Sequence, residues 1–94
     1  MAAMLSITVR GVGVEAKGSQ LVTVFTLSEA PVAEWIHYFR ERARYSVFDA
    51  HNGTFRQNRL RVELPRREDL EQMINSIERF IEGANLDLEF RHPS

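Results

Sequence analysis

Hydrophobic and polar residues alternate with a period of two in three stretches of the chain, a pattern typical of half-buried β-strands. These stretches are residues 5–10, 59–64 and 86–91. A fourth run, LVTVFTL at residues 21–27, is rich in β-branched and aromatic residues and is apolar on both faces. We therefore expect strands in all four places, with residues 21–27 central in a sheet and paired to the first strand as a hairpin.

Two other stretches space their hydrophobic residues by three and four, as amphipathic helices do. The first helix is predicted between Val32 and Ala43, with an apolar stripe made of Val32, Trp35, Ile36, Phe39 and Ala43. The second is predicted after Pro65, which can begin a helix but ends a strand. Gly83 is suited to its C-terminal turn. The stripe of this second helix is Leu70, Met73, Ile74, Ile77, Phe80, Ile81 and Ala84.

The segment YSVFDAHNGTFRQNR, residues 45–59, carries an Asn-Gly pair in its middle. Both residues tolerate the positive φ of a tight turn, so Asn52 and Gly53 predict a β-hairpin. Phe48 on one strand would then lie beside Phe55 on the other, and residues 55–64 would continue as a single strand.

The predicted order of elements is ββα-ββα-β. Two amphipathic helices need one apolar sheet face to cover, so the pattern predicts an α+β fold. We expect a two-layer sandwich, with both helices packed on one face of a mainly antiparallel sheet. The chain of 94 residues is long enough for one domain, and the expected unit is therefore residues 1–94.

The composition is that of an ordinary soluble domain, with 44% hydrophobic and 27% charged residues. The absence of cysteine excludes disulfides, thiolate metal sites and a cysteine nucleophile. No apolar run approaches the roughly 18 residues that a membrane-spanning helix needs. The start, MAAMLSITVR, lacks the basic and apolar regions of a secretory signal. We therefore expect a cytoplasmic protein that does not contact membranes.

The net charge of −1 conceals a strong asymmetry along the chain. Residues 40–67 carry eight arginines against three acidic side chains, a net charge of +5. Residues 68–91 carry seven acidic side chains against two arginines, a net charge of −5. Such asymmetry suits an anionic partner or a molecule that docks on its own kind, and it also describes two solvated faces of opposite sign.

Side chains alternate between the two faces of a strand, and in residues 55–64 this alternation decides which residues are accessible. Leu60 occupies a core position, so without a β-bulge Phe55 would point away from the helices together with Arg59 and Arg61. A bulge between Phe55 and Leu60 would instead turn Phe55 inward. We expect Phe55 to be partly buried and both arginines to face outward.

The leading functional hypothesis is a small non-catalytic binding domain that acts through protein–protein contact, including self-association into a homodimer. The sheet face opposite the helices would be the contact surface, because it would expose apolar and basic side chains together. The candidate binding residues are Val22, Val24, Phe48, Phe55, Arg56, Arg59 and Arg61.

The alternative is single-stranded nucleic-acid binding on the basic, aromatic face of residues 40–67. In that case Phe48 and Phe55 would stack on bases and the arginines would contact phosphates. A pI near 6.3 argues against this reading, because nucleic-acid-binding domains are usually basic.

A third hypothesis is an enzyme that uses Asp49 to orient His51 as a general base. No serine or threonine is marked as an activated nucleophile, so we do not expect catalysis. The motif GVGVEA at residues 11–16 has the letters of a dinucleotide-binding loop but is followed by a turn and a strand rather than a helix. We expect no cofactor and no metal.

Overall fold

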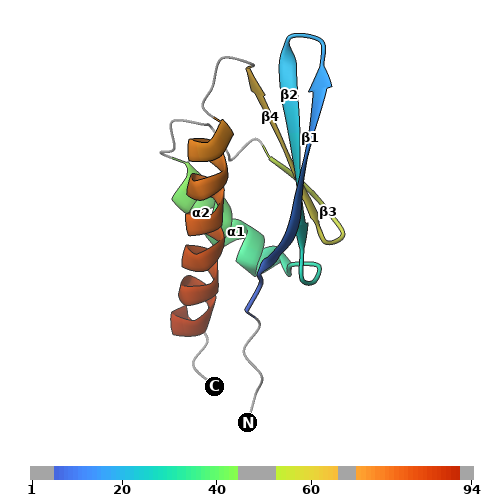
Figure 1. Ribbon diagram of the computed structural model, residues 1–94. Coiled ribbons are helices and arrows are strands. Elements are labelled where there is room, and N and C mark those ends of the chain that lie inside the picture. Colours follow the sequence, from blue (N-terminus) through green and yellow to red (C-terminus); the bar gives the residue numbers. More distant parts are fainter. Residues whose placement is uncertain (1–5, 45–52, 66–69, 92–94) are drawn as a thin grey trace.

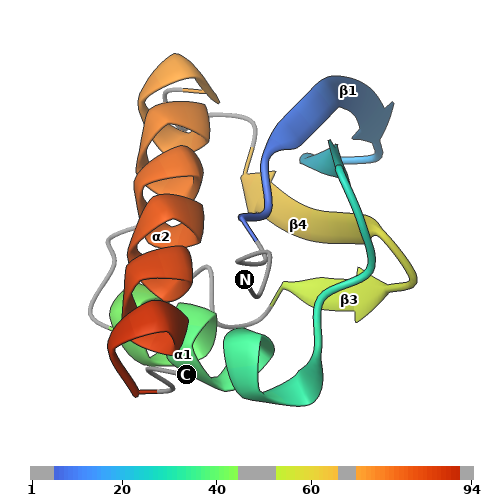
Figure 2. The same ribbon diagram turned by 90° about the horizontal axis from the view of Figure 1, so that it is seen from below.

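The computed structural model describes residues 6–44, 53–65 and 70–91, and it contains a four-stranded sheet and two helices. The elements are β1 (Val9–Lys17), β2 (Gln20–Leu27), α1 (Ala33–Ala43), β3 (Thr54–Arg56), β4 (Arg59–Pro65) and α2 (Leu70–Arg91). The strand order is β1-β2-β4-β3, and all three pairings are antiparallel. Figures 1 and 2 show both helices on the same side of the sheet. The predicted two-layer α+β fold is confirmed.

Strands β1 and β2 form a long hairpin whose tip projects beyond the first turn of α2 (Figure 1). The turn is Gly18-Ser19, where Gly18 has φ of 64°. A glycine with positive φ at the first central position is the residue that a two-residue hairpin turn of type II′ requires. Lys17 and Gln20 therefore face each other across the turn. A β-bulge lies between Val9 and Gly11.

The hydrophobic core lies between the sheet and the helices. Phe25 of β2 pairs with Leu60 of β4, and Thr23 pairs with Val62, so these four residues share the helix-facing side. All four are at least 98% buried. The helices contribute the buried residues Trp35, Phe39, Ala43, Met73, Ile77, Ile81 and Ala84. The alternation of β4 and the helical stripes thus place the core where the sequence predicts it.

The predicted end of the second helix at Gly83 and the predicted strand at residues 86–91 are wrong. Helix α2 continues without a break to Arg91. Gly83 is buried inside it, and a Cβ atom there would clash with the outer part of the Arg42 side chain. Gly83 therefore lies in close contact with the Arg42 side chain, and it does not end the helix. The alternation at 86–91 is too short to outweigh these tertiary contacts.

The predicted single strand over residues 55–64 is also wrong. A turn at Gln57-Asn58 folds β3 back on β4, so that Phe55 pairs with Leu60 and Arg56 with Arg59. Asn58 holds this turn against β2: its carbonyl accepts a hydrogen bond from the Leu27 N–H at 2.7 Å, and its Nδ2 donates to the Leu27 carbonyl at 3.1 Å. The hairpin predicted at Asn52-Gly53 falls largely outside the described residues. Gly53 itself is buried and precedes β3.

Candidate functional site

The hairpin turn at Gln57-Asn58 decides which way Phe55 faces. Residues that pair directly in an antiparallel ladder point to the same side of the sheet, so Phe55 joins Leu60 on the helix side. Its ring meets Trp35 at a centroid distance of 5.9 Å and Phe39 at 5.2 Å, both edge to face. Phe55 is therefore partly buried, as predicted, but a hairpin turn and not a bulge turns it inward.

Arg40 covers the outer side of this aromatic cluster. Its guanidinium carbon lies 5.8 Å from the centre of the Phe55 ring, within the range of a cation–π contact. Arg40 Nη2 also donates a hydrogen bond to the Gly53 carbonyl at 3.3 Å. These contacts give Arg40 a structural role in holding the start of β3 against α1.

The opposite face of the sheet carries three exposed arginines side by side. Arg56 lies directly across from Arg59, and Arg61 follows two positions along the same strand, which puts all three on one side. In the sheet, Arg59 pairs with Thr26 and Arg61 with Val24 of β2. We call Arg56, Arg59 and Arg61 the arginine surface. All three are exposed, as the sequence predicts for Arg59 and Arg61.

The electrostatics of the arginine surface are unfavourable within the molecule itself. Like charges directly opposite each other on neighbouring strands destabilise a sheet. Arg61 has a loose ion pair with Glu63, with Nη2 and Oε1 3.9 Å apart. Among the residues that the structure describes, Arg56 and Arg59 have no ion pair. The pairing of Arg56 with Arg59 is therefore a cost that no acidic neighbour in the described part of the chain offsets.

The apolar part of the predicted contact surface is smaller than expected. Val22 and Val24 do lie on the same face as the arginines, but Val22 is only 1% exposed and Val24 is half-buried. The expectation that Val22 adds an open apolar patch is therefore wrong. In the described chain, the large apolar side chains that are exposed lie elsewhere, at Val12, Val14, Val32, Leu86 and Phe90.

Several sequence candidates fall outside the described residues, namely Phe48, Asp49 and His51. Within the residues that are described, no group of three His, Asp or Glu side chains could hold a metal ion. No helix in the described ranges is long and apolar enough to cross a membrane.

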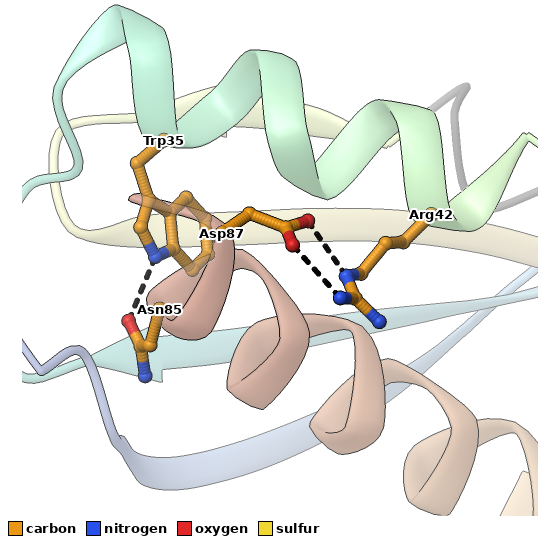
Figure 3. A network of polar contacts seen from close by, with 4 residues as sticks. All are labelled: Trp35, Arg42, Asn85 and Asp87. Atoms are coloured by element: carbon orange, nitrogen blue, oxygen red, sulfur yellow. Dashed lines mark hydrogen bonds and ion pairs between the residues drawn. The ribbon is translucent and has the colours of Figure 1, made fainter. Parts of the chain in front are cut away.

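A polar network joins helices α1 and α2 on the other side of the sheet from the arginine surface (Figure 3). Arg42 donates two hydrogen bonds to Asp87, at 2.8 and 2.9 Å, and Trp35 Nε1 donates to Oδ1 of Asn85 at 2.8 Å. The hydrogen bond with Asp87 raises the pKa of Arg42 above its usual value, although burial acts in the opposite direction. Sequence reasoning missed Asn85 and Asp87 because they lay within the predicted last helical turn and strand. The only sequence signal for this network was the polar residue Asn85 directly after Ala84, the last residue of the predicted stripe.

The comparisons give no relative for this chain: no protein family, curated protein or solved structure matches it. The geometry of the arginine surface is thus the basis for assigning a function.

Proposed function

We propose that this protein is a non-catalytic binding domain whose arginine surface binds an acidic segment of a partner protein. The observation that carries the proposal is the direct pairing of Arg56 with Arg59, both exposed and without an ion pair in the described chain. A bound carboxylate would relieve the repulsion between the two guanidinium groups. Arginine suits this role because its planar fork binds carboxylates in a bidentate manner.

The spacing of the arginine surface favours an extended partner. Arg59 and Arg61 are two residues apart on β4, which places their backbones about 7 Å apart. Side chains on one face of an extended peptide repeat with the same spacing. A segment with acidic residues at alternate positions would therefore present one carboxylate to each of these arginines. Arg56, across the ladder from Arg59, would reach the first carboxylate from the other side.

A protein partner is favoured over single-stranded nucleic acid by the position of Phe55. Stacking of bases on aromatic rings supplies much of the sequence-independent affinity for single strands. Phe55 packs against Trp35 and Phe39 on the helix side, so it is not available on the face that carries the arginines. The other aromatic residue of that reading, Phe48, lies outside the described chain.

Calorimetric titration with a peptide of alternating glutamate and serine tests the proposal. We expect binding that weakens with salt, and Arg59→Glu should lower the affinity by at least about tenfold, equivalent to one lost charge-assisted contact. Arg79→Glu is the matched control, because it makes the same charge change at an exposed site on α2.

Two results would contradict the proposal. One is an equal loss of affinity in Arg59→Glu and Arg79→Glu, which would mean that only net charge matters. The other is binding of oligothymidylate of equal charge that is more than about tenfold tighter than binding of the peptide. That second result would establish single-stranded nucleic acid as the ligand instead.

A further inference from the structure

Strand β1 is an edge of the sheet, and in the described chain its outer side is unpaired. It has nine residues, and Arg10 to Lys17 are all exposed. Val12 and Val14 pair with Phe25 and Thr23 and so point to the helix side, yet they remain 40% and 43% exposed. The helices therefore leave the helix-facing side of β1 largely uncovered.

The turn at Gly18-Ser19 determines which backbone groups of β1 point outward. Lys17 and Gln20 flank a two-residue turn and form its hydrogen-bonded pair. Hydrogen-bonded and non-hydrogen-bonded pairs alternate along an antiparallel ladder. The odd residues back to Gly11 thus bond to β2, whereas Val12 and Val14 direct their N–H and C=O groups away from it. Those groups form an open template for another strand.

The two edges of the sheet differ in their protection against pairing. Proteins usually protect an edge by shortening it or by placing charges or proline on it. Strand β3, the other edge in the described chain, is three residues long and carries Arg56. The β-bulge and the charges of β1, at Arg10, Glu15 and Lys17, lie toward its ends, and its centre, Gly11 to Val14, has neither charge nor proline. The centre of β1 is therefore the edge of the described sheet that is least protected against pairing with another strand.

We propose that β1 pairs antiparallel with β1 of a second copy of this chain, around a two-fold axis through Gly13. Gly13 is the central residue of the nine, and this register pairs Gly11 to Glu15 of one strand with Glu15 to Gly11 of the other, beyond the β-bulge that precedes Gly11. Val12 then faces Val14 of the partner subunit, and the four valines join on the helix side of one continuous sheet. An axis perpendicular to the sheet keeps both helical layers on that side.

Charge and space on β1 favour a second copy as the occupant. In this register Glu15 faces Gly11 of the partner subunit, so no like charges oppose each other in the regular part of the strand. A Cβ atom placed at Gly11 or Gly13 would meet nothing within 4 Å, which leaves room beside Gly11 for Glu15 of the partner subunit. The arginine surface lies at the far edge of the sheet and stays accessible. The dimer would present two such surfaces on one sheet face.

Engineered cysteines test the register, because the natural chain contains none. In Gly13→Cys the two thiols would meet across the axis at a non-hydrogen-bonded pair, where Cα atoms are about 4.5 Å apart. That distance allows a disulfide. Gly11→Cys is the matched control: its two thiols would lie four residues apart along the strands, about 14 Å, which is too far to link.

We expect mild oxidation to convert Gly13→Cys, but not Gly11→Cys, into a disulfide-linked dimer. Sedimentation should show the wild type as a dimer and Val12→Lys as a folded monomer, with its fold checked by circular dichroism. Equal cross-linking of both cysteine variants, a wild type that stays monomeric, or a dimer that Val12→Lys leaves intact would each overturn the proposal. Titration of Val12→Lys with the acidic peptide would still report on the arginine surface separately.

Discussion

The side chain of Asn85 pairs with the backbone of Ile7, 78 positions earlier, in the way that a neighbouring β-strand would. Its Oδ1 accepts a hydrogen bond from the Ile7 N–H at 3.0 Å, and its Nδ2 donates to the Ile7 carbonyl at 2.9 Å. The same Oδ1 accepts from Trp35 Nε1 at 2.8 Å. One amide therefore connects the segment before β1, helix α1 and helix α2.

Replacing this amide should destabilise the protein strongly. Asn85→Ala would leave the Ile7 N–H and the Trp35 Nε1–H without a partner, and both residues are buried. We expect a loss of about 2 to 4 kcal/mol in the free energy of unfolding, measured by urea denaturation. Asn75→Ala is the control, because Asn75 is an exposed asparagine in the same helix. Equal effects of the two substitutions would show that the Asn85 contacts do not stabilise the fold.

Gly83 and the ion pair between Arg42 and Asp87 should be coupled. A Cβ atom at position 83 would displace the Arg42 side chain. Gly83→Ala gains up to about 1 kcal/mol of helix propensity but separates this partly exposed pair. We expect Asp87→Asn to cost up to about 1 kcal/mol in the wild type and less in Gly83→Ala. A double-mutant cycle of Gly83→Ala and Asp87→Asn measures the coupling between the two positions. An equal cost of Asp87→Asn in both backgrounds would mean that Arg42 keeps its position when Gly83 is replaced.

The sequence predicts the core of this protein better than its connections. The alternation that places Leu60 and Val62 in the core and the stripe from Leu70 to Ala84 depend on burial, and burial is what the structure preserves. Gly83 misled because glycine signals both a helix end and a close contact, and only the position of Arg42 distinguishes them. The turn at Gln57-Asn58 was missed because Gln57 is an unusual residue for positive φ, and Asn52-Gly53 gave a stronger local signal.

Backbone strain at Gln57 gives a stabilising prediction. Gln57 has φ of 56°, in the left-handed region that costs a residue with a side chain about 1 kcal/mol or more. Gln57→Gly should therefore raise the free energy of unfolding by about 0.5 kcal/mol after the entropy of glycine is subtracted. Thermal denaturation is the measurement. Asn58→Gly should instead destabilise the protein, because it removes the side-chain hydrogen bond from Nδ2 to the Leu27 carbonyl. A Gln57→Gly variant less stable than Asn58→Gly would contradict this explanation of the turn.

The inward position of Phe55 predicts a loss of stability on truncation. Phe55→Ala would leave a cavity beside Trp35 and Phe39 and should cost about 3 kcal/mol in chemical denaturation. Leu60→Ala, its direct partner in the core, should cost a similar amount. Arg56→Ala, next to Phe55 but on the other face, should cost no stability, because it removes only the repulsion with Arg59. A cost below about 1 kcal/mol for Phe55→Ala would place the ring on the open face.

The most direct test of the account is to map by NMR where the alternating glutamate–serine peptide binds. A ¹H–¹⁵N titration should shift the amides of residues 54–61 in β3 and β4 and of Val24 and Thr26 in β2, and should leave α2 unchanged. Because these strands present one face to the helices and the other to the peptide, shifts confined to them would locate the ligand on the arginine surface. Shifts centred on α2, or spread evenly over the molecule, would contradict the assignment of this surface as the binding site.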